Sequence, residues 1–526
     1  MTAGEIEAGA TRRVRVEAYA LAGVVACFFA GLVYVNCFWS CYPNDNDLDE
    51  VGWLTAHLSL WRPESFANQG YPPGLPVVLR FVSPLVGSFL RAAFLWQAIA
   101  AAASVFFVFR ITTRLCRLRV AGPLALLGAM LAGLPVFTSE FADGTSTALF
   151  LGGLWLLTRS VDRKGFFLFG LAAGLSYLFR THYLILIALV PTALLGAGFG
   201  WRPSARGALA FLAGFAATAW PLWLVNILTY GTPVHAGVSQ YNIALSVIPG
   251  AFDWENYPNT YDQWPVSRIL RERPLDFFSN ALSQALATLG LALSLGGAVF
   301  GAFATVLVRD RQRRRWLAFC ALLALLYILV VIVPTRYTDR AYAPVAMLSC
   351  VLVGCGCAEL VSRAPWPRWG ALGAVLTVLF LSYPAGLLDQ LKARTGDARF
   401  NKQLVKELVA AGMQSSAEVF TNEWNIYNMT DPQFITFYNY GGWIELDSLY
   451  ARERPHPTAH TVAQWQQFFT EHGIRFAILR QNGKTADVFR HTPASWKELY
   501  SGRGLTLWEV AAPAPEARRG GAVTGS

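Results

Sequence analysis

The stretch KGFFLFGLAAGLSYLFRTH, residues 164–182, decides the class of this protein. Residues 165–179 carry no charge, and the basic residues Lys164 and Arg180 stand directly before and after them. A run of this kind predicts a helix that is buried in protein or in a membrane. Further apolar runs lie at 18–38, 88–109, 120–138, 144–158, 183–200, 207–229, 281–308, 316–334, 341–361 and 369–388.

The composition excludes a soluble protein. Of the 526 residues, 54% are hydrophobic and 14% are charged, whereas soluble domains carry about 25% charged residues. So apolar a chain is neither disordered nor collagen-like. We therefore expect an α-helical polytopic membrane protein with about eleven transmembrane helices, some of them short.

The net charge of +10, from 43 Lys and Arg against 33 Asp and Glu, reads as a topology signal rather than as a sign of a nucleic-acid partner. Arg12, Arg13 and Arg15 precede the first span, which places the N-terminus in the cytoplasm. Basic clusters then follow every second span, as alternation requires: Arg110, Arg114, Arg117 and Arg119; Arg159, Arg163 and Lys164; Arg202 and Arg206; Arg309, Arg311 and 313–315; Arg363 and Arg368.

Three regions follow from this pattern. Residues 1–388 form the transmembrane module, with a large first outer loop at 39–87. Within that loop, 72–87 is short and contains Arg80, so it predicts a helix that lies at the outer surface or is partly inserted. Residues 389–510 alternate helix-like (400–411, 463–472) and strand-like (417–421, 476–479) segments and predict a small C-terminal extracytoplasmic α/β domain. Residues 511–526 are rich in Pro, Gly and Ala and predict a disordered tail.

The informative charges lie on the predicted outer face, because ionisable groups beside or within a bilayer are costly and tend to be functional. The first outer loop holds Asp45, Asp47, Asp49 and Glu50 within six positions. One alternative is a solvated loop or a helix start, in which Asp47 or Asp49 caps the helix that 50–61 suggests. Another is a metal-nucleotide D-x-D signature at 45–47, which an outward-facing position disfavours.

Other outer turns add acids and bases. Glu140 and Asp143 follow the third span, Arg180 and His182 follow the fifth, and Arg336, Tyr337 and Arg340 follow the ninth. Arginine suits bidentate capture of phosphate, so this set predicts an anionic lipid head group near an acidic base. The alternatives are that Arg336 or Arg340 pairs structurally with Asp339 or Asp143, and that His182 is structural.

These placements resemble the GT-C superfamily of polyprenyl-phosphate-sugar glycosyltransferases, in the branch of the protein O-mannosyltransferases and the lipid A aminoarabinose transferase. Asp49-Glu50 with Trp53 is similar to the acidic start of the first outer loop in that family. Tyr71 departs from the Lys or His of the family's Pro-Pro-Leu-like region. The resemblance covers about 20–360 and includes motifs at 49–58, 70–76, 143, 170–180, 226–233 and 336–344.

The resemblance implies an inverting glycosyltransferase that moves a sugar from a polyprenyl-phosphate donor to an acceptor hydroxyl. The expected localisation is the plasma (inner) membrane, with several spans and the site on the extracytoplasmic face. The expected partners are the lipid-linked donor, a protein, lipid or polysaccharide acceptor and membrane lipid, with no nucleic acid. No cofactor is required, and a divalent metal on the acids of 45–50 stays an open alternative.

The expected roles divide into three sets. The catalytic set has Asp49 as the general base and Asp47 as the next choice, with Glu50 and Asp143 orienting the base or the sugar. The lipid-phosphate set stabilises the leaving group and the substrate-binding set lines the site. These two sets are Arg336, Arg340 and Arg180, and Tyr71, Glu140, His182 and Tyr337.

Two other classes compete with an enzyme. A secondary transporter or lipid-linked-sugar flippase has a similar number of spans and also carries intramembrane charges. A noncatalytic partner in a cell-envelope complex would tolerate the loss of Asp49. The charges here gather at one face rather than at the midplane, which favours the enzyme.

Overall fold

The computed structural model of the chain describes most of the predicted transmembrane module and parts of the C-terminal region. In the first, the described residues are 3–40, 72–86, 89–116, 121–139, 141–160, 162–234, 266–279, 308–332 and 343–363. In the second they are 406–412 apart from 409, 418–421, 436–439, 466, 469, 470, 475–480, 493 and 495–510.

The apolar runs form helices. The runs predicted at 281–308, apart from its last residue, and at 369–388 lie outside the described residues, and each of the other runs coincides with a helix. The helices are α1 (Ala3–Ser40), α4 (Gly74–Val86), α5 (Phe89–Leu115), α6 (Ala121–Ser139), α7 (Phe141–Arg159), α8 (Arg163–Phe179), α9 (Leu186–Gly196), α10 (Trp201–Tyr230), α12 (Val266–Glu272), α15 (Arg311–Tyr327) and α17 (Ala343–Arg363).

Several helices are suited to a membrane. Within the described part of the chain, four helices are by length and hydropathy able to cross one: Val16–Val35, Arg91–Leu115, Trp201–Leu228 and Arg311–Val331. The chain is therefore a mostly helical polytopic membrane protein. Large apolar side chains lie exposed on its helices, among them Leu21, Phe28, Leu209 and Trp220.

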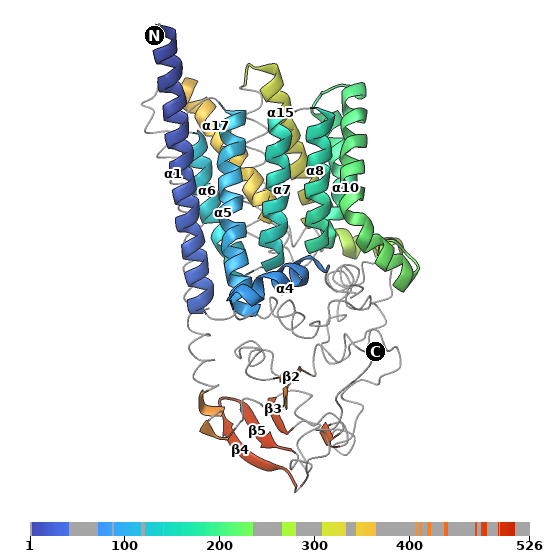
Figure 1. The fold of residues 1–526 in the computed structure, drawn as a ribbon. Coiled ribbons are helices and arrows are strands. Elements are labelled where there is room, and N and C mark those ends of the chain that lie inside the picture. The colour runs from blue at the N-terminus through green and yellow to red at the C-terminus, as the bar shows by residue number, and fades with distance from the viewer. Residues whose placement is uncertain are drawn as a thin grey trace, which may run out of the picture. The chain divides into compact units, whose positions relative to one another are not determined.

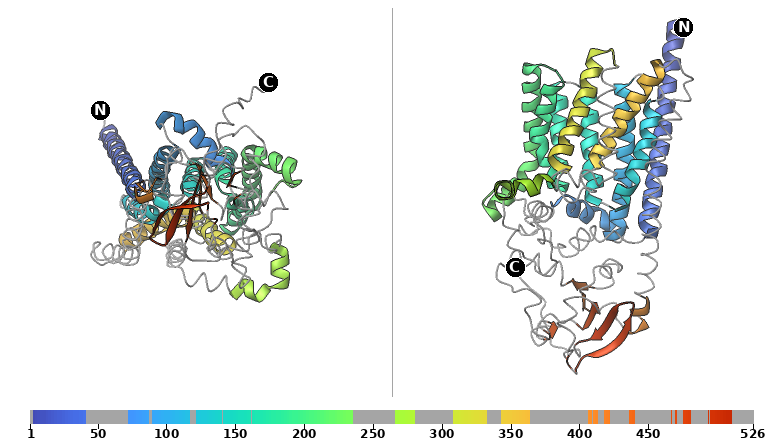
Figure 2. Two further views of the ribbon diagram at one scale, coloured as in Figure 1. Left: turned by 90° about the horizontal axis from the view of Figure 1, so that it is seen from below. Right: turned by 180° about the vertical axis from the view of Figure 1, so that it is seen from behind.

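The helices pack side by side with alternating direction (Figure 1). α5 packs against α1, α6 and α7, and α8 packs between α7 and α10. Figure 2 shows α15 and α17 on the face of the bundle that is hidden in Figure 1. Because successive helices are antiparallel, the basic residues at the end of α7, the start of α8 and the start of α10 gather at one end of the bundle. Asp143 and Arg180 lie at the opposite end, which we call the Asp143 end.

α8 and α10 approach each other through glycines. A Cβ atom on Gly170 would lie 2.0 Å from the carbonyl oxygen of Phe211, and one on Gly214 would lie 2.1 Å from that of Phe167. Small residues spaced along a helix allow this backbone contact, which is common between membrane helices. The contact fixes α8, and with it the position of Arg180 at its end.

Helix α4 lies across the Asp143 end of the bundle (Figure 1). It has 13 residues, which at 1.5 Å per residue span about 20 Å and fall short of a 30 Å hydrocarbon core. Its start packs on the end of α8, since a Cβ on Gly74 would lie 2.5 Å from the Leu178 carbonyl oxygen. Phe81 and Leu85 are 69% and 83% exposed. The helix therefore agrees with the prediction of a short surface element within 72–87.

The strands belong to a second unit of the chain, distinct from the helical bundle. They form one sheet in the order β2-β1-β3-β5-β4, in which β1 is parallel to β2 and β3, and β5 is antiparallel to β3 and β4. β1 (Glu418–Thr421) and β3 (Phe476–Arg480) confirm the two predicted strands. The sequence did not predict β2 (Thr436–Asn439), β4 (Lys497–Gly502) or β5 (Leu505–Glu509).

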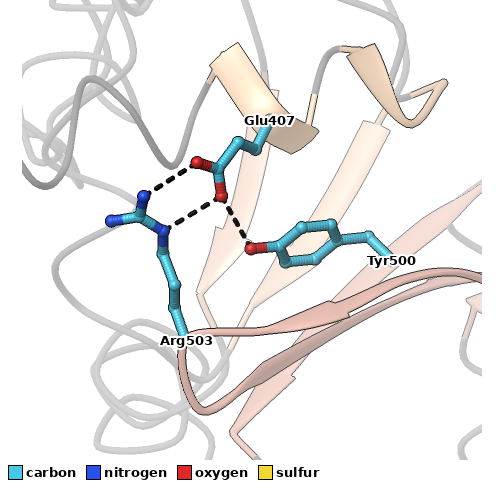
Figure 3. Close-up of polar contacts among 3 residues, drawn as sticks. All are labelled: Glu407, Tyr500 and Arg503. Carbon is cyan, nitrogen blue, oxygen red and sulfur yellow. Dashed lines mark hydrogen bonds and ion pairs between the residues drawn. The ribbon is translucent and has the colours of Figure 1, made fainter.

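The hairpin between β4 and β5 is held by an ion pair. Its two-residue turn places Arg503 at φ 54°, a left-handed conformation that costs a residue with a Cβ about 1 kcal/mol. The Arg503 guanidinium donates two hydrogen bonds to Glu407, from Nε to Oε2 at 3.0 Å and from Nη2 to Oε1 at 2.8 Å (Figure 3). Tyr500 donates a third at 2.9 Å. Desolvation and this hydrogen bond raise the pKa of Tyr500, which keeps the phenol protonated as a donor.

Replacing Glu407 by Gln should loosen this hairpin. The variant keeps the shape of the side chain but removes the charge from the bidentate contact, a loss of about 1 kcal/mol, or about fivefold in opening, for a partly exposed pair. Amide hydrogen exchange of 497–509 in the purified full-length protein measures this loss. Tyr500→Phe is the matched control and should have a smaller effect. Equal protection in Glu407→Gln and wild type would contradict the role of the ion pair.

Candidate functional site

Asp143 lies in the first turn of α7 and is 1% exposed. An acidic side chain there is favoured by the partial positive charge of the helix N-terminus. The polar residues that follow it, Thr145, Ser146 and Thr147, are also buried. Trp96 Nε1 donates to Thr145 Oγ1 at 2.9 Å, and a Cβ on Gly144 would lie 2.6 Å from the Gln97 side-chain oxygen. The first turn of α7 is therefore held tightly against α5.

Arg180 stands where α8 ends. Its backbone is extended, at φ −146° and ψ 120°, and its N–H donates to the Ser176 carbonyl oxygen at 2.9 Å. The chain then forms a 3-10 turn, η1 (Thr181–Ile185), before α9 begins. Ser176 also links α8 to α7, since its hydroxyl donates to the Ser146 carbonyl oxygen at 2.9 Å. These contacts direct Arg180 toward the start of α7.

Asp143 and Arg180 form a buried ion pair. Arg180 Nη2 lies 2.7 Å from Asp143 Oδ2, with the two side chains 10% and 2% exposed. Two charges removed from water are stable only while each compensates the other. The sequence offered Asp143 as a structural partner of Arg336 or Arg340, which lie outside the described residues, and the structure pairs it with Arg180. One predicted orienting acid and one predicted phosphate-binding arginine lie together in this pair.

Three aromatic rings adjoin the ion pair. His182 stacks on Tyr183 with ring centroids 4.8 Å apart, and it meets Tyr327 of α15 edge-on at 6.1 Å. The Tyr183 hydroxyl lies 3.4 Å from Thr147 Oγ1. The sequence singles out His182, whereas the roles of Tyr183 and Tyr327 emerge only from the structure. No sequence signal distinguishes these two tyrosines, because a tyrosine inside an apolar run is ordinary in a protein core.

The remaining predicted site residues lie outside the described residues. The structure therefore brings together Asp143, Arg180 and His182, while the other roles stay predictions. The residues concerned are Asp47, Asp49, Glu50, Tyr71, Glu140, Arg336, Tyr337 and Arg340.

The exit of α10 has a clear physical basis in the motif at 226–233. Gly231 ends the helix at φ 73°, a left-handed conformation that glycine adopts freely. Asn226 Nδ2 donates to the Pro233 carbonyl oxygen at 3.1 Å, which closes the turn after the helix. The motif therefore stops α10 and redirects the chain at the Asp143 end.

A metal centre would require several ligating side chains close together. In the described part of the chain, no group of three or more His, Cys, Asp and Glu side chains is able to hold a metal ion. The acids of 45–50, the candidate ligands in the sequence, lie outside it.

Removing one partner of the buried pair should destabilise the protein. Asp143→Leu removes the carboxylate that lies 2.7 Å from the buried Arg180 guanidinium, which costs about 3–5 kcal/mol. The double variant Asp143→Leu/Arg180→Met removes both charges and should recover most of that stability. Equilibrium unfolding in mixed micelles measures both effects. A single variant as stable as wild type would contradict the ion pair, and a double variant as unstable as the single would show that packing dominates.

Comparison with known proteins assigns the fold. No protein-family model and no curated protein sequence matches the chain. The apo structure of ArnT from Cupriavidus metallidurans is similar with a TM-score of 0.58 and 14% identity, covering 94% of this chain and 100% of that chain. The structure of that protein bound to undecaprenyl phosphate is similar with a TM-score of 0.56 and 13% identity, covering 93% of this chain and 99% of that chain. The apo structure of the oligosaccharyltransferase from Archaeoglobus fulgidus is similar with a TM-score of 0.50 and 11% identity, covering 88% of this chain and 69% of that chain. These structural neighbours are GT-C glycosyltransferases, so the chain has the GT-C fold, as the resemblance in its sequence predicted.

Proposed function

We propose that the chain is an inverting glycosyltransferase that moves a sugar from a polyprenyl-phosphate donor to an acceptor hydroxyl on the extracytoplasmic face of the plasma (inner) membrane. The fold likeness to ArnT carries this proposal, since it extends over 94% of this chain. One of the two ArnT structures holds undecaprenyl phosphate, a polyprenyl phosphate of the class expected here. The acceptor is a protein, a lipid or a polysaccharide.

The proposed topology has about eleven spans, with a cytoplasmic N-terminus and the Asp143 end facing outward. In this arrangement the basic residues at the end of α7 and at the starts of α8 and α10 face the cytoplasm. The first outer loop and the C-terminal α/β domain then lie on the side from which the acceptor enters.

The proposed chemistry needs a general base and a cationic site that binds the phosphate. Asp49 takes the proton of the acceptor hydroxyl as it attacks the anomeric carbon, with Asp47 as the next choice, and Glu50 orients it. The departing polyprenyl phosphate is a weak base, so it requires charge stabilisation rather than a proton. Attack on the face opposite the phosphate inverts the anomeric centre.

The arginines divide this work unequally. Arg336 and Arg340 are proposed to bind the phosphate directly. Arg180 pairs with Asp143, so the field that it exerts on the phosphate is partly neutralised by that carboxylate. Asp143 thereby acts on the phosphate through Arg180. Tyr71, Glu140 and Tyr337 are proposed to line the sugar and acceptor positions, whereas His182, predicted from sequence to share that role, has its Nε2 atom buried inside the bundle.

Asp49→Asn should abolish most of the transfer. General-base assistance is worth about 10²–10⁴-fold in rate, whereas the fold and donor binding do not depend on it. Transfer from a panel of purified polyprenyl-phosphate sugars in nanodiscs provides the assay. Asp47→Asn and Asp45→Asn are matched controls. Full activity of Asp49→Asn together with loss of activity in one of these controls would assign the general-base role to that other aspartate. A wild-type protein that translocates the donor without transferring its sugar would instead favour the flippase.

Transfer should survive removal of divalent metal. The arginines supply the positive charge in the proposed mechanism, so treatment with EDTA should change the rate by less than about twofold. The same nanodisc assay, before and after chelation, measures this. Loss of activity that Mg²⁺ or Mn²⁺ restores would assign a metal to the acids of 45–50.

A further inference from the structure

Two buried polar atoms on neighbouring rings lack hydrogen-bond partners within the described part of the chain. They are Nε2 of His182 and the hydroxyl oxygen of Tyr327. The two rings meet edge to face, with centroids 6.1 Å apart at 83°. An unpaired polar atom inside a protein is unfavourable, and in native proteins most such atoms bind a protein group or an ordered water. The pair therefore indicates a small internal polar site.

Tyr183 encloses this site without satisfying it. Its ring stacks on His182 at 4.8 Å and lies 6.5 Å from Tyr327. Its hydroxyl is engaged elsewhere, 3.4 Å from Thr147 Oγ1. Both unpaired atoms are sealed from solvent, which favours an occupant as small as water over a sugar. A water both donates and accepts hydrogen bonds, so it suits either neutral tautomer of His182.

The site joins two segments that matter to the proposed reaction. His182 is two residues after Arg180. Tyr327 ends α15, and a π-helical turn follows it at Ile328–Ile332. Such turns are rare and frequently occur at functional sites. In the sequence, Arg336 and Arg340 follow this turn closely.

We propose that one ordered water binds between His182 Nε2 and the Tyr327 hydroxyl, and that both are positioning residues for the segments that carry Arg180, Arg336 and Arg340. The proposed water site depends only on these two buried atoms and not on the proposed function. The positioning role rests on the proposed function, because it acts through the phosphate-binding arginines.

A double-mutant cycle on stability tests the water site without any substrate. Tyr327→Phe removes one hydroxyl and keeps the ring. If that hydroxyl binds a water shared with His182, the melting temperature of the purified protein falls by about 1–2 °C. In His182→Phe/Tyr327→Phe the two losses should then be less than additive. A higher melting temperature in Tyr327→Phe, or additive losses, overturns the shared water. Tyr177→Phe, another fully buried tyrosine of the bundle, is the matched control.

Kinetics with the lipid-linked donor test the positioning role. Tyr327→Phe and His182→Phe should raise the KM for the donor by about tenfold and change kcat by less than about twofold. His182→Gln places a polar group near the Nε2 position and should restore the KM, which a purely structural role would not predict. An unchanged KM in Tyr327→Phe overturns positioning. If wild-type protein transfers no sugar from any donor, the proposed function and the positioning role both fail, while the stability cycle still decides the water site.

Discussion

The burial of opposite charges on Asp143 and Arg180 is the constraint on which the Asp143 end depends. Neither charge is tolerable alone in an apolar bundle, so the break after α8 and the first turn of α7 must meet. Trp96 and Gln97 of α5 then fix the same turn of α7 from the other side. The ion pair thus aligns the end of α8 with the start of α7, and the contacts from α5 hold that start in place.

The distribution of polar groups along the bundle reflects the high cost of burying such groups in a membrane. The buried hydroxyls near Asp143, such as Ser146 and Ser176, bond to backbone or to each other's helices. The opposite end instead carries arginines next to capped helix starts, as at Asp310 before α15. Intramembrane polar groups are costly and gather where they are used, so chemistry is expected at the Asp143 end. This agrees with the proposed glycosyl transfer, which needs charged groups close to a lipid-linked donor.

Much of the bundle could be predicted because hydropathy and loop charge are local properties of the sequence. The run 165–179 became α8, and 72–87 gave a helix too short to span. Asp143, Arg180 and His182 were also recognisable, since each breaks an apolar pattern. The pairing of Asp143 with Arg180 was not predictable, because partner choice between distant segments depends on packing, and Arg336 and Arg340 were equally plausible from sequence.

The missed features have physical causes of the same kind. A tyrosine such as Tyr327 inside an apolar run is ordinary in a protein core, so its unpaired hydroxyl is visible only in three dimensions. The hairpin of β4 and β5 was missed because Arg503 occupies a turn position where Asn, Asp or Gly is usual. Its explanation is Glu407, which is far away in the sequence.

The glycine contact between α8 and α10 also determines how this bundle is able to deform. With Phe211 and Phe167 carbonyl oxygens facing the bare Cα atoms of Gly170 and Gly214, sliding one helix along the other would drive side chains into backbone. We therefore expect the two helices to move together as one rigid unit, and Arg180 to move with them. Any change of shape during a reaction cycle has to occur at less closely packed boundaries, and the π-helical turn after α15, with its irregular hydrogen bonding, is a natural place for it.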